Sequence, residues 1–322
     1  MNADRAIVGK RYTCVKLKSK IIPNALVLCS LLLWNVPYPA QQGNSGASLE
    51  SVITKLMVGK PGTAVILDVQ SGKILAQSNL KVAAQRVTTP GSVVKPFALM
   101  RLLESGKLDP ARRLICHRTL TIAGRRMDCT HSPAITNLDA SDAIAYSCNS
   151  YFAQVAVRLS PAELAGAFER AGFTARAGLA ENEAAGRVVT ATDVPRLQLQ
   201  ALGDWGIEIT PLELLAAYRG LALHRLKNDL PWAAPVFTGL EHSVQYGMAH
   251  DALPSGIIAA GKTGTAAGAT PQTHGFFAGY APADKPEIVV MVYLEHGRGS
   301  DAAAIAASIF STYGAASRGA AQ

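Results

Sequence analysis

A serine and a lysine three residues apart offer the chemistry of an activated hydroxyl nucleophile. They lie in residues 90–97, which read PGSVVKPF. Pro-Gly indicates a turn, and apolar residues recur afterwards at three- and four-residue spacing, so we expect Ser92 to open a helix. Residues i and i+3 of a helix share a face, which brings the Ser92 hydroxyl close to the Lys95 amine. A neutral lysine can take the serine proton, provided that burial or a second cation lowers its pKa from about 10.4.

Ser147 and Asn149 form a second polar pair, separated by Cys148. They fall between an expected helix that ends near Tyr146 and another that begins near Tyr151, so their side chains can project from a short loop. A serine hydroxyl there can relay a proton, and an asparagine amide can bind a carbonyl while it also holds a lysine. Taken alone, the pair could instead simply cap the following helix.

The third motif is Lys-Thr-Gly-Thr at residues 262–265, within a strand-like run. Gly264 lets another extended backbone approach closely, and Lys262 adds a charge that can bind a carboxylate and lower the pKa of a nearby lysine. The alternative is an edge-strand lysine that discourages aggregation. A further S-x-x-K pattern occurs at residues 78–81, and we assign it no role. The order S-x-x-K, S-x-N, K-T-G is more specific than any of its parts.

The elements that must position these motifs come from both ends of the chain. Near the amino end, residues 62–69 and 73–77 are strand-like and are joined by a tight turn, which predicts antiparallel pairing. Strand-like runs return near the carboxyl end, before an alanine-rich helix over residues 300–313. These later runs cover residues 256–265, 273–280 and 287–294.

The middle of the chain, over residues 96–240, has a mainly helical pattern. Ser160 and Thr210 each begin a capping box with proline at the first helical position, and Asp139 or Ser141 can cap an earlier helix. We therefore predict an α/β fold of the α+β kind. It consists of one antiparallel sheet built from both chain ends and flanked by helices, with an inserted all-helical subdomain.

Composition indicates a globular domain and argues against a nucleic-acid partner. The chain has 322 residues, of which 49% are hydrophobic and 17% are charged, which suits a large core. Its net charge is +8, but residues 1–20 hold six basic residues and one acidic residue, which leaves only +3 elsewhere. The positive charge is therefore mostly a targeting feature.

Residues 1–40 have the order of an export signal or membrane anchor. A basic segment precedes an apolar run over residues 25–34, which is short for a bilayer span of about 20 residues. We expect this segment to contact the cytoplasmic membrane and to place the rest of the protein at its outer face or in the periplasm. The predicted division continues with residues 41–61, in which a linker over 41–47 precedes a first helix over 48–57. The main domain follows over 62–314, and a flexible tail over 315–322.

Three cysteines lie beyond the targeting segment, and two of them flank an expected hairpin over residues 119–127. In an oxidising compartment these two, Cys116 and Cys129, could form a disulfide. His117 and His131 lie beside them and raise the question of zinc. Their spacing matches no common ligand pattern, so we predict no metal.

These motifs together resemble the transpeptidase domain of penicillin-binding proteins, from about residue 62 to residue 310. Besides the three motifs, the resemblance rests on the hairpin with Asp68 and Ser71-Gly72, on Thr210-Pro211-Leu212 and on Gly279-Tyr280-Ala281-Pro282. It implies the fold shared by serine β-lactamases and penicillin-binding proteins. It also implies a D,D-transpeptidase that needs no metal or organic cofactor.

The resemblance implies a role for each residue of the first two motifs. Ser92 would attack a D-alanyl-D-alanine stem peptide of peptidoglycan and hold the acyl group as an ester. Lys95 would take the serine proton, Ser147 would pass it to the leaving amine, and Asn149 would hold Lys95 and the substrate amide. β-Lactam antibiotics would acylate Ser92 covalently.

It likewise implies that the third motif binds substrate. Lys262 and Thr263 would bind the terminal carboxylate, and Gly264 would allow the close approach of the strand. The backbone N–H groups of Ser92 and Thr265 would stabilise the oxyanion. A small module of this kind could depend on a separate glycosyltransferase to polymerise the glycan.

Three alternatives stay open from the sequence. A D,D-carboxypeptidase would use water as the acceptor. A serine β-lactamase would hydrolyse the acyl-enzyme, but no glutamate here has asparagine four residues on, as the commonest type requires. A penicillin sensor would be acylated without turnover. Residues 201–206 also depart from the usual Gly-Gln-Gly of the family, which leaves substrate positioning there open.

Overall fold

The computed structural model describes residues 43–267 and 272–320. The export signal or anchor predicted over residues 1–40 lies outside the described residues. Within the described part, no helix combines the length and the apolar character that crossing a membrane requires.

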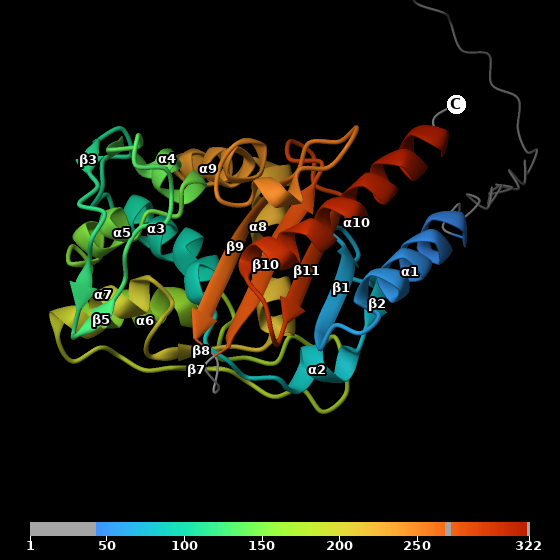
Figure 1. The fold of residues 1–322 in the computed structure, drawn as a ribbon, viewed down its shortest axis with the longest axis horizontal. Helices are drawn as coiled ribbons and strands as arrows, with labels where there is room; N and C mark the ends of the chain where they lie inside the picture. Colours follow the sequence, from blue (N-terminus) through green and yellow to red (C-terminus); the bar gives the residue numbers. More distant parts are fainter. Residues whose placement is uncertain (1–42, 268–271, 321–322) are drawn as a thin grey trace, which may run out of the picture. The chain divides into compact units, whose positions relative to one another are not determined.

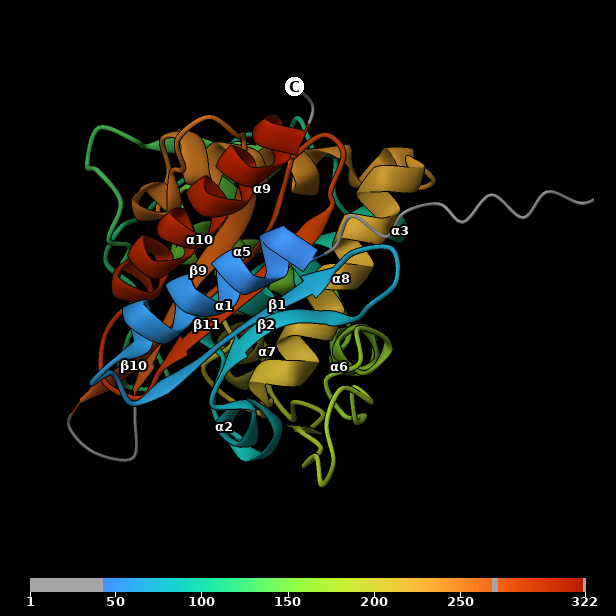
Figure 2. The same ribbon diagram turned by 90° about the vertical axis from the view of Figure 1, so that its right-hand side faces the viewer.

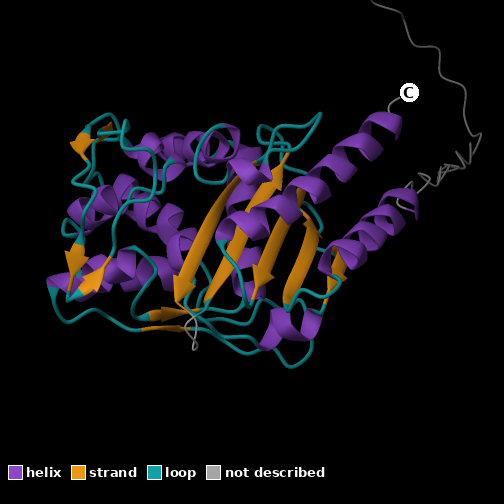
Figure 3. Ribbon diagram, viewed as in Figure 1, coloured by secondary structure: helices purple, strands orange, loops and turns teal. Residues whose placement is uncertain are grey.

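A five-stranded sheet forms the centre of the domain, and all its neighbouring strands pair antiparallel (Figures 1 and 3). The strand order is β2-β1-β11-β10-β9. The strands are β1 (Gly62–Asp68), β2 (Ile74–Ser78), β9 (Ala260–Ala267), β10 (Thr273–Ala281) and β11 (Ile288–Leu294). Strands from the early and late parts of the chain meet where β1 pairs with β11, with Ala64 opposite Val292. This confirms the predicted sheet built from both parts.

Helices cover both faces of this sheet, so its central strands are apolar on both sides. Strand β11 reads IVVMVYL and is buried at every position. Its alternate residues enter two different cores: Met291 and Tyr293 face the core that includes α8 (Pro211–Lys227), and Val290 and Val292 face the other. That second core is closed by α1 (Gly43–Met57) and α10 (Gly299–Ala320), which lie together over one face in Figure 2.

The middle of the chain forms the expected helical insert beside the sheet (Figure 1). Capping boxes are present at Ser160 and Thr210, as predicted. The helices before α8 are α2 (Leu80–Gln85), α3 (Lys95–Glu104), α4 (Ala140–Ala145), α5 (Asn149–Ala156), α6 (Pro161–Arg170) and α7 (Val194–Ala201). Helix α9 (Ala234–Gln245) follows, and single 3-10 turns are η1 (Gly91–Val94), η2 (Pro231–Ala233) and η3 (His250–Ala252).

The insert is not purely helical, which corrects the prediction of an all-helical subdomain. Short two-stranded ladders join segments within it, because its long connections pair locally where no helix forms. The pairs are β3 (Leu114–Ile115) with β6 (Asn137–Leu138), β4 (Thr121–Ile122) with β5 (Arg125–Arg126), and β7 (Arg187–Val188) with β8 (Ile207–Glu208). The pairing of β4 with β5 confirms the hairpin expected over residues 119–127.

Both terminal helices are longer than predicted. Helix α1 begins at Gly43, so the linker predicted before residue 48 is wrong over 43–47. Helix α10 continues to Ala320, so the flexible tail predicted from residue 315 is wrong over 315–320. Residues 314–320 read GAASRGA, and the helix continues past two glycines with Arg318 donating to the Gly256 carbonyl outside it.

Candidate active site

The candidate nucleophile Ser92 lies in η1, a single 3-10 turn that runs directly into α3 at Lys95. This refines the prediction that Ser92 opens an α-helix. Pro96 has no N–H to donate to the Ser92 carbonyl, and the Lys95 N–H bonds to that carbonyl instead, which tightens the turn. Gly91 precedes it at φ +61°, and its N–H donates to the Gly203 carbonyl at 3.0 Å. Ser92 itself is half-buried.

Lys95 is fully buried and is held by the Ser147–Asn149 loop. Its Nζ donates to the Ser147 carbonyl at 2.9 Å, to Asn149 Oδ1 at 2.5 Å and to Ser147 Oγ at 3.3 Å. Burial lowers the pKa of Lys95 from its ordinary value to about 8. Within the described residues no carboxylate forms an ion pair with Lys95, so no carboxylate offsets the effect of burial on its pKa.

The loop that carries Ser147 and Asn149 is shaped for contact with Lys95, not for capping. Ser147 adopts a left-handed conformation with φ +51°, uncommon for a residue with a side chain. The N-cap of α5 is Cys148, whose Sγ accepts the Tyr151 N–H, so the capping interpretation of Ser147 and Asn149 is wrong. Asn149 Nδ2 donates to the Met127 carbonyl at 3.0 Å, which fixes the amide so that Oδ1 faces Lys95.

Lys262 on β9 is the second buried amine of the site. It is 0% exposed, which excludes the interpretation as a solvated edge-strand lysine. Its Nζ donates to Ser147 Oγ at 2.8 Å and to the Thr263 carbonyl at 3.0 Å. Burial, and then the charge of Lys95, lower its pKa well below the ordinary value. Ser147 Oγ therefore lies between two lysine amines.

The remaining residues of the third motif form the strand edge that faces the Ser92 turn. A Cβ on Gly264 would lie 2.6 Å from the Pro90 carbonyl oxygen, so only glycine permits this approach. Thr263 Oγ1 donates to the Met248 carbonyl at 3.2 Å, while Thr265 is exposed and its Oγ1 accepts the Gly299 N–H at 2.9 Å. The structure thus brings all three motifs into one site.

Two supports of the site carried no signal in the sequence analysis. Gly203 adopts φ +78°, and a Cβ there would lie 2.1 Å from the Gly91 carbonyl oxygen. The segment 201–206, which departs from the family pattern, therefore supports the Ser92 turn by close backbone contact. On the other side, the buried Tyr218 hydroxyl of α8 donates to the Val93 carbonyl at 2.9 Å. Both are long-range backbone contacts, which residue spacing does not reveal.

The two cysteines predicted as a disulfide are free in the structure. Cys116 Sγ lies 3.5 Å from His131 Nε2, and Cys129 Sγ lies 3.7 Å from Cys148 Sγ. The fold places each of the two sulfurs against a different partner, so the predicted Cys116–Cys129 bond is not formed.

Fold and site together bring the edge strand of an antiparallel sheet against the turn and helix that carry S-x-x-K. The family model described as the penicillin binding protein transpeptidase domain matches residues 62–313. The chain belongs to this family.

Comparisons with individual proteins agree with the family. A curated relative, the probable peptidoglycan D,D-transpeptidase PenA of Neisseria flavescens, is 38% identical over 68 residues. The match covers 16% of this chain and only 17% of that relative's length.

Solved structures share the fold at low identity. The transpeptidase domain of penicillin-binding protein 3 from Burkholderia pseudomallei superposes with a TM-score of 0.72 at 23% identity, over 84% of this chain and 92% of that one. Penicillin-binding protein 2 from Pseudomonas aeruginosa, in complex with WCK 5153, gives 0.73 at 20% identity, over 82% and 76%. These likenesses show the fold, which confirms the predicted fold class.

Proposed function

We propose that this protein is a peptidoglycan D,D-transpeptidase that works through a serine acyl-enzyme and binds penicillin. The observation that carries the proposal is the position of Ser147 Oγ, 3.3 Å from Lys95 Nζ and 2.8 Å from Lys262 Nζ, beside the Ser92 turn. Two fully buried amines on one hydroxyl form a path along which a proton can move. The family membership supports the same reaction.

In the acylation step, neutral Lys95 takes the Ser92 proton as Oγ attacks the carbonyl carbon of the penultimate D-alanine. The C–N bond to the terminal D-alanine breaks, and the leaving amine receives a proton through Ser147. Ser92 now carries the stem peptide as an ester. Asn149 keeps Lys95 in place through its Oδ1.

The β9 edge has the groups to bind the substrate's terminal carboxylate. Lys262 would supply an amine whose charged form a bound carboxylate favours, and Thr263 would supply a hydroxyl. The backbone N–H groups of Ser92 and Thr265 would stabilise the oxyanion. One such donor is commonly worth about 3 kcal/mol in the transition state. A β-lactam presents a carboxylate and a reactive carbonyl to the same groups, so it acylates Ser92 as well.

The acyl group then passes to an amine of a neighbouring stem, and Ser92 regains its proton. A D,D-carboxypeptidase would deliver the ester to water instead, and it is the second candidate because the same residues serve both acceptors. The proposed place of work is outside the cytoplasm, where peptidoglycan lies, with residues 1–40 as signal or anchor. A separate glycosyltransferase would supply the glycan strands.

The test is covalent labelling by a fluorescent penicillin, followed by intact mass over time. We expect one long-lived adduct on the wild type and none on Ser92→Ala. Ser78→Ala is the matched control, because Ser78 begins the other S-x-x-K pattern, and it should label normally. Labelling of Ser92→Ala would contradict the assignment of Ser92 as the nucleophile. Rapid loss of the adduct, with release of hydrolysed drug, would indicate a β-lactamase. To separate transfer from hydrolysis, the protein is then incubated with a donor peptide and a D-amino acid. Transfer gives a peptide that carries the added amino acid, and hydrolysis gives a shortened peptide, so the product mass distinguishes them.

A further inference from the structure

Three cysteines and one histidine from separate segments meet in one buried cluster close to the active site. Their ligand atoms all lie within 4.8 Å of one another. Exposure is 6% for Cys116, 7% for Cys129, 3% for His131 and 0% for Cys148. The reaction proposed above uses none of these side chains.

We propose that Cys116, Cys129, His131 and Cys148 bind one zinc ion with tetrahedral coordination. Zinc–sulfur bonds of about 2.3 Å and zinc–nitrogen bonds of about 2.0–2.1 Å place two sulfurs about 3.8 Å apart and a sulfur and a nitrogen about 3.6 Å apart. Two opposite edges of the cluster match these values. Cys129 and Cys148 are separated by 3.7 Å between sulfurs, and Cys116 Sγ lies 3.5 Å from His131 Nε2.

The imidazole is oriented as a metal ligand requires. His131 Nδ1 lies 3.1 Å from the Ser132 carbonyl oxygen. A carbonyl can only accept, so the Nδ1 proton is used in this bond and the neutral ring turns the lone pair of Nε2 into the cluster. Second-shell carbonyls commonly fix metal-bound histidines in this way.

Each of the three sulfurs also accepts a backbone N–H, which suits thiolates. The donors are Arg118 to Cys116 at 3.4 Å, Ser150 to Cys129 at 3.3 Å and Tyr151 to Cys148 at 3.4 Å. Metal binding converts the three thiols to thiolates, with release of their protons and no change in oxidation state. Soft sulfur donors in a tetrahedral set with one imidazole favour zinc over magnesium or calcium.

Four protein ligands leave no open coordination position, so the proposed zinc is structural. Its effect would reach the active site through Cys148, which lies between Ser147 and Asn149. On the other side, Asn149 Nδ2 donates to the carbonyls of Met127 and Asp128, the two residues before Cys129. The ion would thus join the 116–131 segment to the loop that holds Lys95.

The first experiment measures metal directly and is independent of enzymatic activity. The full chain is purified under reducing conditions without chelator, and its zinc content is measured before and after reconstitution with Zn²⁺. We expect about one zinc per chain, and cobalt substitution should give the thiolate charge-transfer and intense visible bands of a tetrahedral site. Failure to bind zinc or cobalt stoichiometrically would overturn the proposal. So would a native Cys129–Cys148 disulfide, seen as a mass two hydrogens lower, that excludes the metal.

Matched histidine variants test the ligand set. His131→Ala should weaken zinc binding at least about 100-fold, the upper range seen when second-shell partners alone are lost. His117→Ala should bind normally, because His117 is exposed and lies next to the cluster without joining it. His131→Cys should restore binding as a four-cysteine site. Equal loss in His117→Ala and His131→Ala would contradict the assignment.

A second readout tests the link to the active site and rests on the proposed function. Removing zinc with a chelator should slow penicillin acylation about tenfold to 100-fold, since small misplacement of catalytic groups has effects of this size. Adding zinc back should restore the rate. Unchanged acylation in metal-free protein would refute the link to Ser147 and Asn149. Absence of acylation in the zinc-loaded protein would count against the proposed function and leave the metal site standing.

Discussion

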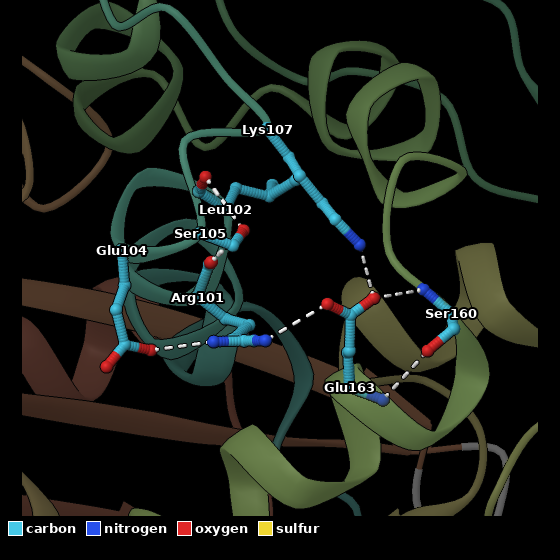
Figure 4. Close-up of polar contacts among 7 residues, drawn as sticks. All are labelled: Arg101, Leu102, Glu104, Ser105, Lys107, Ser160 and Glu163. Atoms are coloured by element: carbon cyan, nitrogen blue, oxygen red, sulfur yellow. Dashed lines mark hydrogen bonds and ion pairs between the residues drawn. The ribbon is translucent and has the colours of Figure 1, made fainter.

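One helix, α3, links two groups of cations with opposite surroundings. At its first residue lies Lys95, which with Lys262 forms a fully buried pair; within the described residues neither has a carboxylate partner. Six residues on, Arg101 shares the carboxylate of Glu163 with Lys107 (Figure 4). The buried pair loses proton affinity, and the pKa of Lys95 falls to about 8. In the other group the pKa of the acid Glu163 falls, because the neighbouring cations favour its charged form.

Both carboxylate oxygens of Glu163 accept hydrogen bonds from neighbouring donors. Its Oε2 accepts from Lys107 Nζ at 2.5 Å and from the Ser160 N–H at 2.8 Å, and its Oε1 accepts from Arg101 Nη2 at 3.0 Å. Lys107, the Ser160 N–H and Arg101 lower the pKa of Glu163 to about 2. The comparison teaches that burial without a carboxylate partner lowers the pKa of a lysine towards neutral pH, whereas cations that pair with a carboxylate lower the pKa of that acid.

The largest effect is expected from removing Lys95, the proposed base. Lys95→Met should slow penicillin acylation by about 1,000-fold, within the range of 100-fold to 10,000-fold typical of a lost general base. Lys107→Met is the matched control and should acylate within about twofold of the wild type, because the Lys107 amine pairs with Glu163 and not with the proposed catalytic residues. Second-order acylation rates of the three proteins are compared at pH 7.5. A Lys95→Met variant that acylates at the wild-type rate would remove Lys95 from the mechanism.

A smaller effect is expected from changing pH. Only neutral Lys95 can take the Ser92 proton, so acylation should rise about tenfold per pH unit below its pKa and level off above about 8. The measurement is the acylation rate from pH 5.5 to 9.5 with a β-lactam that does not titrate in this range. A flat profile would show that Lys95 is not the base whose ionisation limits the rate.

Asn149→Asp would give Lys95 the carboxylate that it lacks and so sharpens this test. Asn149 Oδ1 already lies 2.5 Å from Lys95 Nζ. An anion at this distance favours the charged amine, so the inflection should move to higher pH by about one unit or more. Acylation at pH 7 should fall, and raising the pH should restore much of it. An inflection that stays at the same pH would show that the profile does not report the ionisation of Lys95.

The two groups also differ in how far sequence patterns predict them. The capping box of Ser160 and Glu163 is local, because four consecutive residues contain both partners, and the pattern alone predicted it correctly. The three motifs of the proposed active site were recognisable because each is short and their order is specific. The sheet followed from alternating or continuous apolar runs that end at clear turn residues.

Features that depend on tertiary contacts were missed or misjudged. Cys148 looked like a spacer between Ser147 and Asn149, and only the fold shows it beside Cys129, 19 residues earlier in the chain. The carboxyl end of α10 was predicted too early for the same reason. The last turns of α10 are close to Gly256, whose carbonyl accepts from Arg318, and no local pattern encodes that contact.

The smallest effect is expected where cations and carboxylate are already paired. Glu163→Gln removes the charge and keeps a side chain that can complete the capping box, so it isolates the ion pairs. The folded-state pKa of about 2 lies below the unfolded value of about 4.3, so the stabilisation is fully present above pH 4.3 and is lost as pH falls towards 2. The urea midpoint of Glu163→Gln should therefore be below that of the wild type at pH 6, and the difference should narrow at pH 3.

Glu104→Gln, which removes only an Arg101 contact at 3.1 Å, is the control and should change the midpoint less. A difference that stayed constant from pH 6 to pH 3 would mean that Glu163 stabilises the fold through packing or neutral hydrogen bonds, and that the contrast between the two cation groups is not electrostatic.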